Sequence, residues 1–287
     1  MLFSLLAVAL AFFQGTEANQ LDRIWKEDFA PSQTITDLRT IDWNIDRGTR
    51  FEEVAQSLEH AHADLCLLQE VDLFDRRSGD RNVAEDLAKR LKLNYAVAPS
   101  FQELSQAESG KAAYQGQAIL SRMPILSVRV IRFQAQSSFW KPRPFLPNVP
   151  LMQRRQGGRT ALVTELKGPK GNIVVYNVHF ESRSTGKIQM AQLRELLADA
   201  EQYPETTPVI LGGDFNTLYY SKPFLELLKA SGYTNAFGDK VPRTHRGLGN
   251  LDWILTRGPA RIENAVVDTG AQGSDHFPVS ATILFKQ

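Results

Sequence analysis

Polar side chains that could bind a metal ion or activate water follow a short apolar segment near residue 210. Residues 208–211 form an apolar run typical of a buried strand, and Asp214 and Asn216 come directly after it in Gly212-Gly213-Asp214-Phe215-Asn216-Thr217. An acid and an amide two residues apart are also typical of a turn, in which they bond to nearby backbone. This segment alone therefore leaves a turn and an active site as open interpretations.

The same pattern recurs along the chain, which favours a site. Polar groups follow the apolar runs at residues 38–43, 65–68 and 173–178, and the run at 251–255 carries an acid near its start. A rigid sheet holds the loops at its edge together, so such groups can converge. The candidates are five carboxylates, two amides and two imidazoles: Asp46, Glu70, Asp214, Asp252, Asp275, Asn44, Asn216, His179 and His276.

The composition of this set indicates a class of chemistry. It contains no cysteine, and hard oxygen ligands without thiolates suit Mg²⁺, Mn²⁺ or Ca²⁺ better than structural zinc. Imidazoles beside an oxygen-bound cation suit phosphate ester hydrolysis, in which the cation and hydrogen-bond donors hold the developing negative charge. The chain has no Gly-x-Ser-x-Gly elbow, no P-loop, no Gly-x-Gly-x-x-Gly fingerprint and no His-Glu-x-x-His cluster.

At these residues the chain resembles the endonuclease/exonuclease/phosphatase superfamily. That group includes deoxyribonucleases, apurinic/apyrimidinic endonucleases, neutral sphingomyelinases and inositol-phosphate 5-phosphatases. The matching motifs occur in the family's order over residues about 37–285. They are Trp43-Asn44-Ile45-Asp46, Leu68-Gln69-Glu70-Val71, Gly116-Gln117-Ala118-Ile119-Leu120-Ser121-Arg122, Asn177-Val178-His179, Gly212-Gly213-Asp214-Phe215-Asn216, Leu251-Asp252-Trp253-Ile254 and Ser274-Asp275-His276-Phe277-Pro278-Val279.

The resemblance implies a metal site. Glu70 resembles the principal ligand of a divalent cation, with Asn44 and Asp46 beside it. Asp275 resembles a second carboxylate that binds metal or positions water. The implied cofactor is Mg²⁺, with Mn²⁺ or Ca²⁺ as alternatives, and Asp46 could instead only cap a turn.

The resemblance also implies catalytic roles. Asp214 resembles the group that orients or deprotonates the attacking water, and Asn216 would hold that water or a phosphate oxygen. His276 would contact the scissile phosphate, with Asp252 fixing its tautomer. His179 matches the subset of the family that includes deoxyribonucleases and sphingomyelinases, and the apurinic/apyrimidinic enzymes usually differ there.

Helical and strand-like segments indicate the fold class. Thr49-x-x-Glu52 predicts a capping box before a helix, and apolar residues at helical spacing predict helices around residues 83–91 and 188–197. Strands outnumber helices. With the resemblance, this predicts an α/β (α+β) fold in which two mixed β-sheets pack face to face with helices outside, a four-layer sandwich in one domain over residues 21–287.

Residues 1–20 differ from the rest of the chain. Residues 2–13 form an uncharged apolar run, which is too short to span a bilayer and is typical of a signal-peptide core. The run favours export to the periplasm or the extracellular space. Because no Lys or Arg precedes it, a cytoplasmic protein or a short N-terminal membrane anchor stay as alternatives.

The charge distribution suggests which side of the protein meets a substrate. The net charge is +1, but residues 109–164 hold nine basic groups and no acid, so the remainder carries −8. This stretch could be a solvated surface or a face for a polyanion. Residues 139–147 read as an aromatic, basic surface loop. The candidate substrate-binding residues are Arg122, Trp140, Arg143 and His245.

These patterns together predict an enzyme, a metal-dependent phosphodiesterase of the nuclease type that acts as a monomer on nucleic acid. A phospholipid or sugar-phosphate hydrolase is the alternative, since residues 139–147 could also touch a lipid headgroup. A non-catalytic binding protein on the same scaffold would normally lack metal or water positions, and here those positions are filled.

Overall fold

The computed structural model describes residues 20–31, 35–105, 107, 111–141 and 155–285. Its helices are α1 (Phe51–Ala61), α2 (Val83–Leu91), α3 (Lys187–Ala200) and α4 (Ser221–Ala230). Its strands are β1 (Trp25–Glu27), β2 (Asp37–Arg47), β3 (Leu65–Asp75), β4 (Arg81–Asn82), β5 (Asn94–Glu103), β6 (Ala113–Ser121), β7 (Ile125–Arg132), β8 (Arg155–Gly157), β9 (Thr160–Gly168), β10 (Gly171–His179), β11 (Val209–Asp214), β12 (Thr234–Asn235), β13 (Asp252–Arg257), β14 (Ala260–Val267) and β15 (Val279–Phe285).

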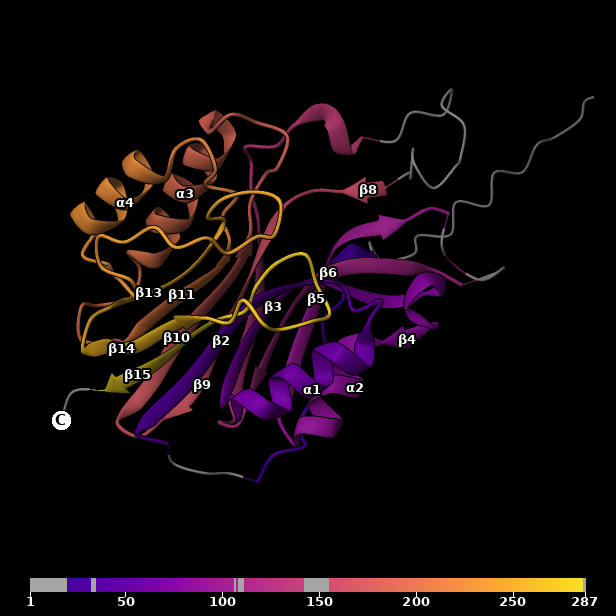
Figure 1. The fold of residues 1–287 in the computed structure, drawn as a ribbon, viewed down its shortest axis with the longest axis horizontal. Helices are drawn as coiled ribbons and strands as arrows, with labels where there is room; N and C mark the ends of the chain where they lie inside the picture. Colours follow the sequence, from indigo (N-terminus) through magenta and orange to yellow (C-terminus); the bar gives the residue numbers. More distant parts are fainter. Residues whose placement is uncertain (1–19, 32–34, 106, 108–110, 142–154, 286–287) are drawn as a thin grey trace, which may run out of the picture.

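The strands form two mixed sheets. The larger sheet has the order β1-β5-β6-β3-β2-β15-β14, with β4 paired to β3 and β8 paired to β5. The smaller sheet has the order β12-β13-β11-β10-β9-β7. β2 and β3 run parallel, as do β10 and β11, and every other pairing is antiparallel. Figure 1 shows α1 and α2 beside the larger sheet, and α3 and α4 beside the smaller one.

Three apolar layers hold these four layers of structure together. One packs α1 and α2 on the larger sheet, and another packs α3 and α4 on the smaller sheet. The third lies between the sheets, where side chains such as Leu67, Ile119, Val175 and Ile210 are almost fully buried. Removal of this apolar surface from water is the main force that docks the layers. The predicted four-layer α/β sandwich is confirmed.

The predicted helices begin close to where the sequence placed them, but the predicted capping box does not form. The N-cap of α1 is Arg50, and no side chain caps that helix. The Thr49 hydroxyl instead donates to the Asp46 carbonyl 3.2 Å away, because the chain turns sharply between β2 and α1. The start of α2 does carry a side-chain cap, since Asn82 Oδ1 accepts from the Glu85 amide at 3.2 Å.

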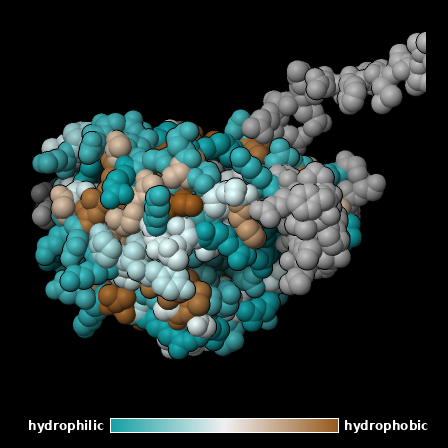
Figure 2. Space-filling model, turned by 90° about the horizontal axis from the view of Figure 1, so that it is seen from above, coloured by the Kyte–Doolittle hydropathy of each residue, from teal (hydrophilic) through white to brown (hydrophobic). Residues whose placement is uncertain are grey.

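The candidate signal peptide or anchor at residues 1–20 falls, up to residue 19, outside the described residues and stays a prediction. Among the helices that the structure does describe, none has the length and apolar character needed to cross a membrane. The face seen from above in Figure 2 is mainly hydrophilic, with separate small hydrophobic patches.

Candidate active site

Local irregularities shape β2 near its end and β3 near its middle. The register between β2 and β3 shifts between Asn44 and Arg47, and that between β3 and β6 shifts between Leu68 and Val71. Asp46 and Glu70 lie within these shifts and adopt left-handed backbone, with φ of 43° and 51°. Such backbone is costly for residues other than glycine and concentrates at functional sites. The irregularities turn both carboxylates away from the regular positions of the strands.

Strand direction in the smaller sheet brings three further predicted residues together. His179 and Asp214 are neighbours in the parallel pair β10–β11. Asp252 starts β13, yet it pairs with Asp214 because β13 runs antiparallel to β11. Gly213 permits the close approach of β11 to β10. Its φ is 141°, and a Cβ there would lie 2.1 Å from the Val178 carbonyl oxygen.

His276 is held by a chain of hydrogen bonds. Its Nδ1 lies 2.9 Å from Asp252 Oδ2, and the Thr244 hydroxyl donates to that same oxygen at 2.6 Å. Burial would lower the pKa of His276. The charge and hydrogen bond of Asp252, with the charges of Asp214 and Asp275, together outweigh burial and raise the pKa to about 10. Its Nε2 points toward Asp214, with Oδ2 at 3.8 Å. His276 is therefore a buried, protonated imidazole whose free nitrogen faces the centre of the cluster.

Asp214 occupies that centre. Asn44 Nδ2 donates to its Oδ2 at 3.2 Å, and His179 Nε2 lies 3.4 Å from the same oxygen. Its Oδ1 accepts from the backbone amide of Asn216 at 3.0 Å. Burial and the charge of Asp252 raise the pKa of Asp214 to about 6. At neutral pH this carboxylate is ionised yet basic enough to take a proton, as a general base must be.

The two histidines differ in charge. Burial lowers the pKa of His179 well below its ordinary value, and the guanidinium of Arg159 lowers it further. His179 is therefore neutral where His276 is protonated. Asn216, whose φ is 50°, donates from Nδ2 to the Phe180 carbonyl at 3.1 Å. That bond ties the loop after β11 to the end of β10.

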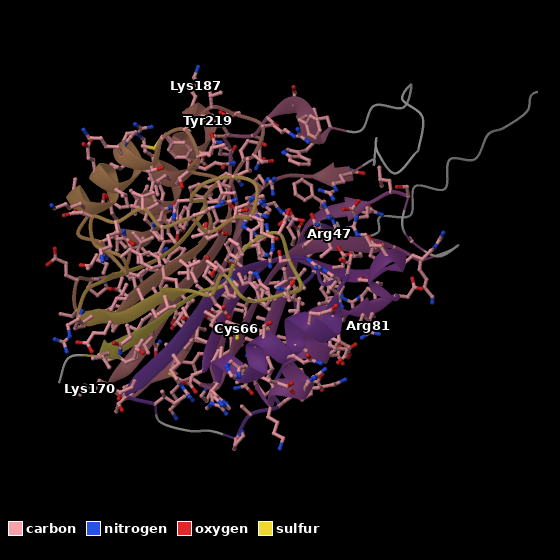
Figure 3. The ribbon with its side chains drawn as sticks, in the orientation of Figure 1. Arg47, Cys66, Arg81, Lys170, Lys187 and Tyr219 are labelled. Atoms are coloured by element: carbon pink, nitrogen blue, oxygen red, sulfur yellow. The ribbon has the colours of Figure 1, made fainter. Side chains whose placement is uncertain are left out.

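The residues around Glu70 fit a divalent cation. Burial would raise the pKa of Glu70, but the guanidiniums of Arg47, Arg155 and Arg159 hold it below its ordinary value. Arg47 pairs with Asp46 Oδ1 and lies 3.5 Å from Glu70 Oε2, so a positive group already bridges two carboxylates. Figure 3 shows Arg47 toward one end of the molecule, far from Lys170 at the other. Carboxylate oxygens that converge on a cation are the donors that Mg²⁺ prefers.

Two further groups of possible ligands lie within the described part of the chain. They are Asp214, Asp252 and His276, and His245, Asp275 and His276, with the ligand atoms of each group within 4.8 Å of one another. His276 Nδ1 is already engaged by Asp252. A cation in either group would compete with these hydrogen bonds, which makes the Glu70 side the better fit.

His245 lies beside the cluster, in a backbone bridge with His276. Its Nδ1 accepts from the amides of Gly247 and Leu248, each at 2.9 Å. The proton of the neutral ring must then be on Nε2, which lies 3.4 Å from Asp275 Oδ2. This hydrogen bond lowers the pKa of Asp275. Asp275, whose side chain is 59% exposed, is thus a firmly ionised carboxylate at the rim.

Of the other candidate substrate-binding residues, Arg122 is not brought to this cluster. Arg122 directly follows β6 and pairs with Asp64, which directly precedes β3. It therefore lies at the end of these strands that is away from Glu70. Trp140 is only 8% exposed, and its indole donates to Glu181 at 2.8 Å. Arg143 lies outside the described residues.

Several residues at the site were not singled out from the sequence. Gln115 donates to Glu70 at 3.3 Å, and Thr244 supports Asp252. Asp42 lies within β2, and burial and the charge of Asp252 raise its pKa well above its ordinary value. Asp42 could have been noticed in the sequence as an acid within an apolar strand. Arg159 was visible only as one of nine basic groups, and nothing in the sequence distinguishes it from the others.

Comparisons with known proteins identify the family and the fold. A model of the Endonuclease/Exonuclease/phosphatase family matches residues 43–276. The human Nocturnin catalytic domain with bound sulfate anion has a TM-score of 0.66 at 17% identity and covers 92% of this chain and 98% of its own. An endonuclease/exonuclease/phosphatase from Beutenbergia cavernae DSM 12333 has a TM-score of 0.64 at 16% identity, and the match covers 88% of this chain and 72% of that protein. Truncated Caenorhabditis elegans TDP2 has a TM-score of 0.55 at 19% identity, and the match covers 86% of this chain and 97% of that protein. The comparison with curated proteins found no match.

Proposed function

The chain belongs to the endonuclease/exonuclease/phosphatase family, and we propose that it is a divalent-metal-dependent phosphodiesterase of the nuclease type. Members of this family are metal-dependent phosphoesterases. The observation that carries the proposal is the buried pairing of Asp214 with His276, whose pKa values of about 6 and about 10 suit a base and an acid at neutral pH.

In the proposed mechanism, Asp214 takes a proton from the attacking water. Asn44 and the Asn216 amide hold the Asp214 carboxylate in place through the bonds described above. Protonated His276 donates from Nε2 to a phosphate oxygen, while Asp252 fixes the orientation of its ring. Neutral His179 offers a further hydrogen bond to the phosphate as negative charge develops.

We assign the metal to the Glu70 side of the site. Glu70, with Asn44 and Asp46 beside it, would hold the cation, and Asp275 is available at the rim for a second ion or for water. A bound Mg²⁺ would neutralise the phosphate charge. Nucleic acid is the proposed substrate. The half-exposed ring of Phe139, with 48% of its surface accessible, favours a phospholipid as the second candidate.

The test measures hydrolysis of bis(p-nitrophenyl) phosphate and nicking of plasmid DNA, with and without Mg²⁺ or Mn²⁺. We expect metal-dependent cleavage of both, and a loss of about 10²–10⁴-fold in rate for Asp214→Asn and for His276→Ala. The matched control is Asp86→Asn, since Asp86 is a half-exposed acid on α2 whose ion pair is with Arg81. Thermal unfolding of each variant shows whether the fold is intact.

The outcomes separate the candidates. Diester cleavage without nicking would keep the chemistry and direct the search to phospholipid vesicles and sugar phosphates. Full activity of Asp214→Asn would remove this residue from the mechanism. Inactivity of the wild-type protein on every phosphate ester would leave a non-catalytic binding protein as the better interpretation.

A further inference from the structure

Two neighbouring tyrosines on the loop after β11 face in opposite directions. Tyr220 is only 5% exposed, donates to the Phe215 carbonyl and lies 6.1 Å from the ring of Phe224, so it anchors the loop. Tyr219 is 70% exposed, and within the described residues its ring has no hydrogen bond and no ring partner. A single exposed ring is ordinary on a protein surface, but the surroundings of this one are not.

Tyr219 lies close to the proposed catalytic groups. It follows Asn216 by three residues, so the two Cα atoms lie within about 11 Å of each other. The loop after β10 packs against the same segment, because a Cβ at Gly186 would lie 3.1 Å from atoms of Tyr220. Figure 3 accordingly shows Lys187 and Tyr219 beside one another at one end of the molecule. The exposed ring and an exposed lysine therefore border the site on the same side.

The two loops present positive charge to solvent. Residues 182–190 and 215–225 contain no acid and three basic side chains, Arg183, Lys187 and Lys222. None of the three is ion-paired with a described residue. Glu181, which precedes the first range, is buried and occupied by hydrogen bonds. The Arg183 guanidinium lies 4.3 Å from the centre of the Phe139 ring, which holds this cation in place and covers one face of that ring.

The charges around Tyr219 indicate the direction in which a polyanion would run. The groove that Tyr219 lines continues along α4 to Glu226 and Asp239, and these acids would repel a phosphate. Lys187, on the other side of the ring, would attract it. A membrane surface would require a wider apolar area, whereas this end of the molecule is mainly hydrophilic (Figure 2). An exposed ring next to unpaired cations is instead what single-stranded nucleic acid requires.

We propose that Tyr219 stacks on an unpaired nucleobase next to the scissile phosphate, while Arg183 and Lys187 attract the sugar-phosphate backbone. The substrate class is then a single-stranded polynucleotide. Every base has a flat face on which an aromatic ring can stack, and in a duplex that face is already covered by neighbouring bases. This inference rests on the proposed phosphodiesterase function and specifies its substrate.

The test compares phosphodiesters that share one leaving group. Thymidine 5′-(p-nitrophenyl phosphate) and its 3′ isomer carry a base, and methyl p-nitrophenyl phosphate carries none. We expect the wild-type protein to prefer at least one thymidine ester over the methyl ester in kcat/KM. Tyr219→Ala should reduce that preference by about 10- to 100-fold, as loss of one stacked base predicts. Tyr219→Phe should keep it, because the ring remains.

Matched variants show whether the effect belongs to this surface. Leu126→Ala removes another exposed apolar side chain, on β7, and should keep the wild-type preference. Lys187→Met and Lys170→Met remove lysines that lie at opposite ends of the molecule (Figure 3). Only Lys187→Met should weaken binding of a labelled single strand. Equal losses on all three esters for Tyr219→Ala, or no wild-type preference, would overturn the stacking role.

Binding without turnover separates this inference from the proposed function. Fluorescence anisotropy of labelled oligothymidylate in the absence of metal should show tighter binding than its duplex with oligoadenylate, and Tyr219→Ala should weaken the single-strand binding about tenfold. If the wild-type protein hydrolyses no ester but this pattern holds, the phosphodiesterase function fails and the stacking surface stands.

Equal single-strand binding by the wild-type protein and Tyr219→Ala would reject the surface, whatever the activity. Binding to phosphatidylserine vesicles that is lost in Tyr219→Ala, with oligothymidylate binding unchanged, would assign the ring to a membrane and also reject it.

Discussion

At the scale of single residues, the site depends on a proton held by His276. Burial favours the neutral ring, but the ion pair with Asp252, together with the charges of Asp214 and Asp275, outweighs burial and raises the pKa to about 10. We expect the imidazole signals of His276 to titrate near pH 10 in nuclear magnetic resonance spectra of the metal-free protein. In Asp252→Asn the ring stays buried without its partner, so its pKa should fall to its ordinary value or below.

The same proton contributes to stability. A raised pKa means that the folded protein binds the proton more tightly than the unfolded chain does. The stabilisation is therefore complete below the ordinary pKa of 6.5 and is lost as the pH rises toward about 10. Thermal unfolding should show a smaller decline over this range in Asp252→Asn. An unchanged His276 titration in that variant would contradict the assigned ion pair.

At the scale of secondary-structure elements, buried amides link the two sheets below the site. Asn177 on β10 donates to the carbonyls of Leu68 on β3 and Ala118 on β6, at 2.9 and 2.8 Å. Its Oδ1 accepts from Gln69 at 2.7 Å. Asn177→Ala would leave these buried groups unpaired, and we expect a loss of about 2–4 kcal/mol in the free energy of unfolding.

Urea denaturation measures that loss. The control is Asn172→Ala on the same strand, because the exposed Asn172 side chain bonds, within the described structure, only to the Glu165 side chain. It should change the free energy of unfolding by less than about 0.5 kcal/mol. Equal effects of the two substitutions would mean that the amide link does not hold the sheets together.

Strand direction also explains how much of the site the sequence could predict. The polar groups within β2, β3, β10 and β11 could be recognised, because each comes directly after an apolar run. Arg122 was expected at the substrate because it shares a motif with Gly116, but the two residues lie toward opposite ends of β6. The burial of Trp140 and of Arg159 depends on contacts between distant segments, which no local pattern encodes.

At the scale of the whole molecule, the basic stretch is not one open basic face. Within the described residues, Arg129 and Arg155 are paired with Asp199 and Glu103, as Arg122 and Arg132 are with their acids. Four of the nine basic groups are thus neutralised, so we expect at most about five phosphate contacts with single-stranded DNA. The slope of log affinity against log salt should then be roughly −3.5, instead of the −6 that nine contacts would give.

Fluorescence anisotropy of a labelled oligonucleotide, with Asp214→Asn to prevent cleavage, measures this slope between 50 and 200 mM salt, a range of about fourfold over which such slopes are resolved. A slope near −6 would indicate that the ion pairs open to make a continuous polyanion-binding surface. Arg129→Met, which removes a paired guanidinium, should leave the slope unchanged.

One consequence follows from where the site residues fall along the chain. Asn44 and Glu70 precede Lys141, whereas His179, Asp214, Asp252 and His276 follow Arg155. The sheets interleave the two parts, since β15 pairs with β2 and β8 pairs with β5. A protein divided between these positions would give two fragments that each lack part of the site. On the proposed function, turnover would return only when the fragments associate, as a split-enzyme reporter requires.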